Sequence, residues 1–234
     1  IIETGLQHGT ITIVIGGEGY EVTTYRVDGN YSDNRRPDSV TFTNNLVEDL
    51  KRRDFTINAM AYNDEVGLVD PFNGMEDIKY HKIRCVGRAE DRFSEDALRI
   101  LRAIRFASQL GFVLEPDTDW NISKMYKKLE NISIERINSE FCKIVNSGDF
   151  CVQMVLYHDV FSLFIPEIND MIGFQQHNPY HIYDVWNHTV HAVEAYECDC
   201  EPDLNPRDLI TSLAIFFHDI GKPHCYQDSE DGIR

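Results

Sequence analysis

The sequence predicts an α+β fold, in which a small mixed α/β head is followed by an all-helical body. Two segments rich in β-branched residues, GTITIVI and YEVTTYRV, lie near the start, and the GGEG between them favours a hairpin. From about residue 94 onward, apolar residues recur at helical spacing instead. A chain of 234 residues is long enough for more than one domain. We predict three parts, residues 1–80, 81–165 and 166–234.

Glycine, proline and polar stretches divide the chain into successive elements. A polar loop that contains Gly29 and SDNRRPDSV separates the predicted strands from the first helix. Gly111, Gly148 and Pro166 mark breaks between helices, and residues 166–184 are predicted to form a polar loop. Helical spacing predicts helices over residues 47–62, 98–110, 118–129, 134–146, 150–164, 185–196 and 209–218.

Composition limits the class of protein. The chain is 42% hydrophobic and 26% charged, as in ordinary globular proteins. No apolar run approaches the roughly 20 residues that span a bilayer. We therefore expect a cytoplasmic protein with no membrane partner. Six scattered cysteines without a Cys-x-x-Cys pair indicate reduced thiols rather than disulfides or a zinc finger.

The net charge of −17 is unevenly distributed. Residues 84–105 hold six arginines against four acidic residues, whereas residues 192–234 hold three basic residues against ten acidic ones. A polyanion is therefore expected to bind the first region, and a metal cation the second.

An arginine stripe runs along the predicted helix 98–110 and consists of Arg99, Arg102 and Arg105. Ser94 is a suitable N-cap, and the two acids that follow it suit a positive helix end. Asp96 and Arg99 are then expected to be neighbours one turn apart. On an isolated helix such a stripe is a solvated, salt-bridged face. Only the motifs elsewhere along the chain favour the alternative interpretation, in which the stripe binds a polyanion.

The segment KRRDFTINAMAYN, residues 51–63, carries a basic cluster at the start of a predicted helical stretch. Helix starts favour anions, and an arginine there can bind phosphate or ribose oxygens. Alternatively, Arg53 pairs with Asp54 or Glu48 on the surface. Beyond this segment, DPFNGMEDI contains a turn and IRCVG returns to extended structure.

The strings RRDFTINAMAY, DPFNGMEDI and EDALRILRAIRF, in this order and spacing, resemble the tRNA nucleotidyltransferase and poly(A) polymerase family, in its bacterial and eukaryotic class II. The resemblance implies that residues 1–80 are the C-terminal part of a nucleotidyltransferase head. It implies that a helical neck and body follow and hold tRNA. The implied activity is template-independent, Mg²⁺-dependent addition of CCA from CTP and ATP to the tRNA 3′ end. Addition of A alone, or poly(A) synthesis, is the alternative within the family.

The resemblance also assigns roles to the charged residues. Asp96 and Arg99 are implied to recognise the base, because a carboxylate accepts from an exocyclic amino group and a guanidinium donates to ring nitrogen or carbonyl. Arg102 and Arg105 are implied to bind the triphosphate or nearby RNA phosphate. Arg53 is implied to bind the sugar or phosphates of the incoming nucleotide.

Nucleotidyl transfer needs carboxylates that hold metal ions. The family supplies two aspartates two residues apart after a Gly-Gly motif, and Gly16 and Gly17 do not match that pattern. We therefore expect a fragment that lacks this pair and is inactive by itself. Glu21 is implied as a third metal-site carboxylate, with pairing to Arg26 as the alternative. Residues 26–40 resemble the family's mobile loop, with candidate residues Arg35, Arg36 and Asp38.

The segments YHIYDVWNHTVHAVE and IFFHDIGKP resemble the first half of an HD phosphohydrolase signature. His188, His218 and Asp219 are candidates for holding one divalent transition metal. Alternatively, they persist as a helical scaffold. If the metal site dominates, the protein is a metal-dependent phosphohydrolase acting on nucleotides or cyclic phosphates. A third hypothesis is that residues 1–234 only bind nucleotide or RNA.

Overall fold

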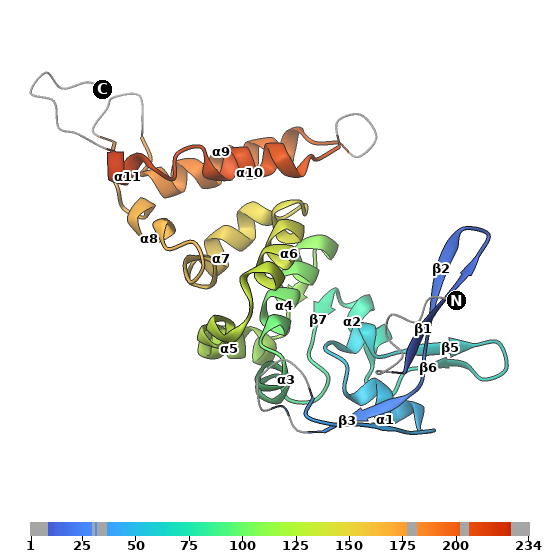
Figure 1. Ribbon diagram of the computed structural model, residues 1–234. Coiled ribbons are helices and arrows are strands. Elements are labelled where there is room, and N and C mark those ends of the chain that lie inside the picture. The colour runs from blue at the N-terminus through green and yellow to red at the C-terminus, as the bar shows by residue number, and fades with distance from the viewer. Residues whose placement is uncertain (1–8, 30, 32–36, 177–181, 202–205, 226–234) are drawn as a thin grey trace, which may run out of the picture.

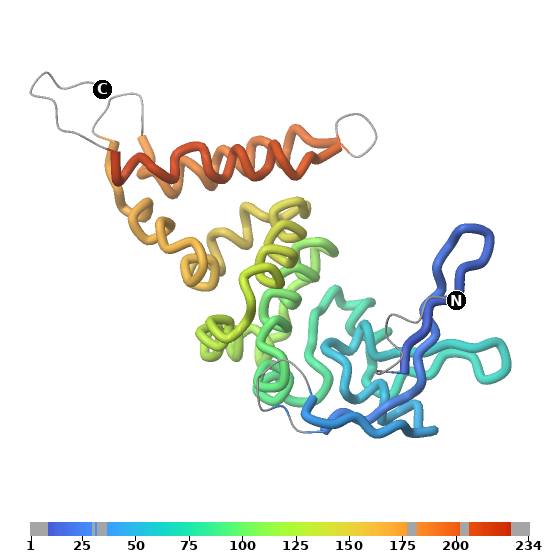
Figure 2. The backbone as a smooth tube through the Cα atoms, viewed as in Figure 1, coloured from blue at the N-terminus to red at the C-terminus, as the bar shows by residue number. Residues whose placement is uncertain are grey.

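The computed structural model describes residues 9–29, 31, 37–176, 182–201 and 206–225, so Arg35 and Arg36 lie outside the described residues. The chain forms a curved, elongated molecule (Figures 1 and 2). A head built of short strands and helices forms one end, a column of helices forms the middle, and the antiparallel pair α9 and α10 lies at the far end. No described helix combines the length and the apolar character that a membrane span requires.

The described residues of the head form three antiparallel strand pairs. The predicted hairpin is confirmed: β1 (Thr10–Ile15) pairs with β2 (Glu18–Thr23), and Ile15 lies opposite Glu18. The two-residue turn has φ values of 62° and 93° at Gly16 and Gly17, a region that residues with a Cβ rarely adopt. The other pairs are β3 (Arg26–Asp28) with β4 (Val40–Phe42), and β5 (Ala61–Asn63) with β6 (Gly67–Val69).

The predicted helix over residues 47–62 is wrong beyond Lys51. Helix α1 (Leu46–Lys51) begins where the Asn45 side chain accepts from the amide of Val47 at 3.0 Å. Past its end, the Asp54 carboxylate accepts from the amide of Phe55 at 2.9 Å, and Phe55 forms a bridge to Cys85. Phe55 is fully buried there. Pairing with the extended segment around Cys85 therefore replaces further helix, and only the 3-10 helix η2 (Thr56–Asn58) follows.

Helices dominate the rest of the chain, apart from a short parallel pair of β7 (Lys82–Ile83) with β8 (Val113–Leu114). The predicted helices from residue 98 onward are confirmed to within a few residues at their ends. The predicted loop over residues 166–184 is wrong in part, because a short helix forms just after Pro166. The helices are α2 (Gly74–Lys79), α3 (Ala89–Glu95), α4 (Leu98–Leu110), α5 (Pro116–Met125), η3 (Tyr126–Asn131), α6 (Ile134–Val145), α7 (Phe150–Ser162), α8 (Glu167–Met171), α9 (Val185–Asp199), α10 (Leu209–Phe217) and α11 (Lys222–Cys225).

Ser94 is not the N-cap of the arginine-bearing helix, contrary to the prediction. It lies inside α3, and Asp96 follows in an extended conformation with φ −139° and ψ 106°. The Asp96 Oδ1 atom accepts from the amide of Leu98 at 3.1 Å, so this side chain satisfies a free donor at the start of α4. The acidic segment thus connects α3 to α4, and this connection fixes the position of the Asp96 carboxylate.

The main hydrophobic core of the described residues runs from Phe55 in the head to Phe216 in α10, and Leu50, Ala59 and Val86 form a smaller cluster in the head. Ile100, Leu101 and Ile104 of α4 are fully buried at the centre of the main core. This core contains residues from all three predicted parts of the chain. The structure therefore does not separate these parts, and the boundaries between them remain predictions. An aromatic cluster around Phe141 fills the far end of the core, and its other rings belong to Phe150, Phe161, Phe164 and Phe216.

We expect Phe141→Ala to lower the free energy of unfolding by about 3–5 kcal/mol, because it empties the centre of four edge-to-face ring contacts. Urea unfolding followed by circular dichroism measures this change. Tyr62→Ala, at a ring that is 70% exposed, is the matched control and should change stability by less than about 0.5 kcal/mol. Equal effects of the two variants would contradict the assignment of Phe141 to the core.

Candidate functional site

A cleft of about 680 Å³ lies between the head and helices α4 and α6. This volume falls within the range of about 300–1,000 Å³ that is typical of small-molecule sites. Five arginines and three aspartates dominate its lining, together with two aromatic rings. The lining residues are Thr23, Tyr25, Asp49, Arg52, Arg53, Asp54, Asn58, Asp96, Leu98, Arg99, Arg102, Phe106 and Arg136. The cleft thus brings together four of the residues that the sequence singles out: Arg53, Asp96, Arg99 and Arg102.

Arg99 forms the floor of the cleft and is only 9% exposed. Its guanidinium donates to Glu95 at 2.6 Å, to the Arg92 carbonyl at 3.2 Å and to the Arg52 carbonyl at 3.0 Å. Arg92 similarly donates to the Lys51 carbonyl at 2.9 Å. Two arginines from α3 and α4 therefore satisfy free carbonyls at the C-terminal end of α1, where cations are favourable.

Asp96 is held from two sides. Oδ1 accepts from the amide of Leu98, and Oδ2 forms an ion pair of 3.0 Å with Arg136 of α6. The sequence does not single out Arg136, because nothing in its spacing shows that α6 packs alongside α4. The carboxylate is therefore fixed in position at the edge of the cleft, one turn before Arg99.

Arg102 joins the helical column to the head through Asp54. The Arg102 Nε atom donates to the Asp54 carboxylate at 2.8 Å, and Asn58 donates to the same carboxyl group at 3.2 Å. Burial raises the pKa of Asp54, but the charge and hydrogen bonds of Arg102 outweigh burial and bring the pKa below its usual value. The Arg102 side chain is 32% exposed, so part of its guanidinium still faces the cleft.

Arg53 is the most accessible of these cations, with a side chain that is 45% exposed. Its partners are Asp49 at 3.5 Å and the Asn58 carbonyl at 3.3 Å, rather than Asp54 or Glu48. Burial raises the pKa of Asp49, yet hydrogen bonds from Arg52 and from the Arg26 amide bring it below its usual value. Arg52, which the sequence motif contains but does not distinguish from Arg53, is therefore tied more tightly than Arg53.

Arg105 does not line the cleft. Its guanidinium forms an ion pair of 3.1 Å with the buried Glu140 and lies 4.2 Å from the centre of the Phe106 ring. The reason is geometric: residues three apart on a helix are about 300° apart, so the stripe turns by about 120° between Arg99 and Arg105. The phosphate role implied for Arg105 does not fit this geometry, and we do not propose it further.

Glu21 also lies outside the cleft lining, on an exposed strand and opposite Thr12. Because side chains alternate along a strand, Glu21 shares a face with Thr23, which does line the cleft. The alternative partner considered for Glu21, Arg26, forms an ion pair with Asp28 at 3.1 Å.

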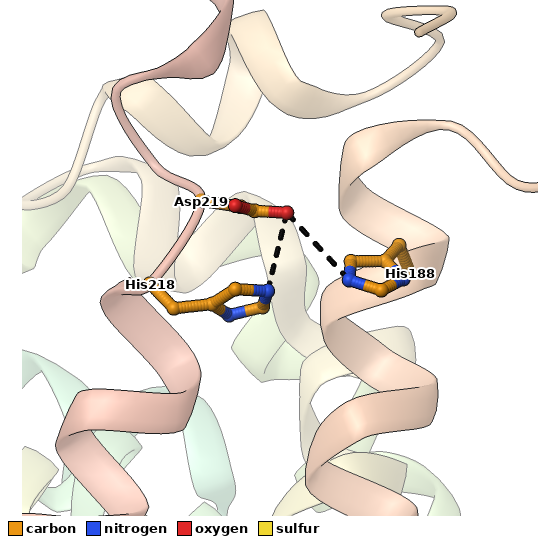
Figure 3. A group of neighbouring side chains, drawn as sticks. All are labelled: His188, His218 and Asp219. Atoms are coloured by element: carbon orange, nitrogen blue, oxygen red, sulfur yellow. Dashed lines mark ion pairs between the residues drawn. The ribbon is translucent and has the colours of Figure 1, made fainter. Parts of the chain in front are cut away.

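A second cluster lies at the opposite end of the molecule, between α9 and the end of α10 (Figure 3). Its members are His188, His218 and Asp219, and their ligand atoms lie within 4.8 Å of one another. The Asp219 Oδ2 atom is 3.1 Å from His218 Nε2 and 3.6 Å from His188 Nε2. The His218 Nδ1 atom is 2.6 Å from the Ile215 carbonyl, which holds Nε2 toward the carboxylate.

This donor set fits a divalent transition metal, since imidazole and carboxylate are common ligands of such ions. Lys222 is the competing cation, because its Nζ atom lies 2.7 Å from Asp219 Oδ2. The scaffold alternative also agrees with the geometry, since His218 directly follows α10 and Asp219 begins the next turn. Asp219 is buried in either case.

Two protein-family models match the chain. Residues 1–84 match the poly A polymerase head domain, and residues 111–172 match a probable RNA- and SrmB-binding site of polymerase A. Among curated proteins, the CCA-adding enzyme of Lactobacillus johnsonii is 55% identical over 143 residues, and that of Lactobacillus helveticus is 57% identical. These alignments cover 61% of this chain but only 36% of each relative.

Two solved structures extend the similarity over nearly the whole chain. The CCA-adding enzyme of Bacillus stearothermophilus in complex with CTP is 31% identical, with a TM-score of 0.62 over 95% of this chain and 66% of that chain. A tRNA nucleotidyltransferase complexed with a primer tRNA and an incoming ATP analog is 27% identical, with a TM-score of 0.64 over 93% of this chain and 62% of that chain.

The two family models together cover more than half of the chain, and they end before the histidine and aspartate cluster, whose HD resemblance stays a prediction. The mixed α/β head, the helical body and the similarity to these enzymes agree with the resemblance carried by the sequence motifs. The chain belongs to the CCA-adding tRNA nucleotidyltransferase and poly(A) polymerase family.

Proposed function

We propose that the whole protein adds CCA to the 3′ end of tRNA, using CTP and ATP. The observation that carries this proposal is the cleft in which Asp96 and Arg99 lie together at the joint between head and helices. Relatives named CCA-adding enzymes, and structural neighbours that hold CTP or a primer tRNA with an ATP analog, support it. We further propose that residues 1–80 are the C-terminal part of the head, that 81–165 are the nucleotide- and RNA-binding neck and body, and that 166–234 form a partial HD-type helical domain.

The hydrogen-bonding groups of Asp96 and Arg99 that the protein itself does not use are available to recognise a base. A guanidinium has five N–H groups, and three of those on Arg99 are used by the described protein. An Nε–H and one Nη–H remain for a base edge, while the Asp96 carboxylate keeps unused lone pairs for an exocyclic amino group. Because the protein already fixes both groups, little conformational entropy is lost when a nucleotide binds.

The remaining cations suit the charged part of the nucleotide. Arg53 and the open part of Arg102 provide donors for sugar and phosphate oxygens, which guanidinium groups bind with two parallel hydrogen bonds. Phe106 and Tyr25 add apolar surface to the cleft lining. The local excess of arginine attracts a triphosphate although the chain as a whole is acidic.

Mg²⁺, when bound, neutralises triphosphate charge and activates the primer hydroxyl. Of the described residues, we propose Glu21 as a contributor to that metal site, since it shares a strand face with Thr23 of the cleft. The carboxylates that line the cleft are Asp49, Asp54 and Asp96, and each of them is engaged by an arginine. We therefore propose that residues 1–234, tested alone, bind nucleotide without transferring it.

A tRNA extension assay tests the main proposal. We expect the whole protein, given Mg²⁺, CTP, ATP and tRNA that lacks its tail, to add C, C and A, as sequencing of the products will show. Products that contain only adenosine would support A addition or poly(A) synthesis instead. Arg88→Gln, at an exposed arginine outside the cleft, is the control and should leave the product unchanged.

The second cluster supports a second candidate function. We propose that His188, His218 and Asp219 hold a divalent transition metal, in a phosphohydrolase that acts on nucleotides or cyclic phosphates. The observation that favours it is the convergence of three ligand atoms within 4.8 Å, one from α9 and two from the residues that directly follow α10.

Calorimetric titration with Mn²⁺ or Ni²⁺ tests the metal site. We expect one equivalent to bind and His218→Ala to abolish binding. We expect Lys222→Gln to tighten binding, because it removes the ammonium that neutralises Asp219. His158→Ala, at a surface histidine beside Asp159, is the matched control. Absence of metal binding in both the native chain and Lys222→Gln would favour the scaffold interpretation.

A further inference from the structure

A separate hollow of about 370 Å³ lies on the head, beside α2 and β7. Its lining includes Phe72, Asn73, Tyr80, Lys82 and Arg84, and it shares no residue with the lining of the nucleotide cleft. The cleft is built around α4, whereas this hollow is built by residues 72–84, which include α2 and β7. The proposed nucleotide-binding residues leave it unused.

At the edge of the hollow, two lysine ammonium groups lie over an aromatic ring. The Tyr80 side chain is 55% exposed, and the Nζ atoms of Lys79 and Lys82 lie 5.5 and 5.9 Å from the centre of its ring. Among the described residues, no carboxylate forms an ion pair with either lysine. Residues 79–84 hold three basic residues and no acidic one, in a chain of net charge −17. Over residues 76–84 these three basic residues outnumber the two carboxylates, Glu76 and Asp77, so the local charge is slightly positive beside an exposed ring.

The floor beneath this rim is fixed. Asp77 is 4% exposed and accepts from the Thr56 hydroxyl at 2.7 Å and from Arg84 Nε at 3.1 Å. A Cβ atom at Gly74 would come within 2.3 Å of the Thr56 carbonyl, so helix α2 packs directly against η2. The Arg84 side chain remains 43% exposed, so it still has donors that face the hollow. The hollow thus has a rigid floor beside an exposed ring, an arrangement that is preorganised for a ligand.

The combination matches one chemical unit, a nucleotide. Bases stack on exposed aromatic rings regardless of sequence, and lysines beside the ring neutralise the phosphates on either side. Asn73 and the Glu76 carboxylate on the same lining offer polar groups to a base edge. We propose that Lys79, Tyr80 and Lys82 bind a single-stranded segment of RNA, with a base stacked on Tyr80 and phosphates on the two lysines. This proposal extends the proposed function to a second RNA contact but does not require nucleotide transfer.

Fluorescence anisotropy with a short labelled single-stranded RNA, titrated with the 234-residue chain, tests the proposal. We expect Tyr80→Ala to weaken RNA binding about 5- to 100-fold, and Tyr80→Phe to preserve it because the stacking face is retained. We expect Lys79→Gln combined with Lys82→Gln to flatten the dependence of log affinity on log salt by about 1.4. Tyr62→Ala, at an exposed tyrosine without flanking lysines, is the matched control for the ring.

RNA affinity that is unchanged in Tyr80→Ala would overturn the proposal, as would an unchanged salt slope in the double lysine variant. Cytidine and adenosine monophosphate are tested separately as free ligands. Binding of these monophosphates that depends on Tyr80, without RNA binding that depends on Tyr80, would assign the hollow to a free nucleotide and contradict the RNA assignment. CTP affinity should be unchanged in Tyr80→Ala. Failure of tail addition by the whole protein would leave this binding result intact, so the two proposals are tested independently.

Discussion

The structure depends on the contact in which arginines from α3 and α4 donate hydrogen bonds to the C-terminal end of α1. Arg92 donates to the carbonyl of Lys51, and Arg99 donates to that of Arg52. Three residues after Arg99, Arg102 donates to the buried Asp54 carboxylate. These bonds do two things at once: they attach the head to the helical column, and they set the position of the groups that face the cleft. A buried guanidinium without such partners would be strongly unfavourable. The site therefore exists only when the two parts of the molecule are correctly packed.

These contacts explain how an acidic chain maintains an arginine-lined cleft. Each arginine that lines it keeps a carboxylate or carbonyl partner, so the positive charges do not repel one another without compensation. The partners use only part of each guanidinium, and the rest remains available for a nucleotide. Arg105 shows the opposite outcome on the same helix: rotation carries it into the interior, where Glu140 and the Phe106 ring surround it. On α4, Arg99 in the cleft and Arg105 in the interior thus differ by about a third of a turn.

Much of this arrangement follows from the sequence, and the exceptions have physical causes. The hairpin at Gly16 and Gly17 and the ends of α4 obey local rules, so the pattern predicts them well. The helix predicted past Lys51 fails because Phe55 gains more from burial beside Cys85 than from helical hydrogen bonds. Arg136 could not be identified as a partner of Asp96, since that contact spans 40 residues and depends on how α6 packs. Local pattern finds the residues of the site, whereas tertiary packing decides which of them face it.

The central claim, that Arg99 reads the base while Arg105 supports the fold, is tested most directly by comparing nucleotide selectivity in two variants. Calorimetry of CTP and UTP binding is measured for Arg99→Lys and for Arg105→Ala. Arg99→Lys keeps the charge but loses the planar fork, so the preference for CTP over UTP should fall about 10- to 100-fold. Arg105→Ala should lower the free energy of unfolding without changing that preference, because Glu140 loses one of its two partners. Selectivity that survives in Arg99→Lys, or that is lost in Arg105→Ala, would contradict the account.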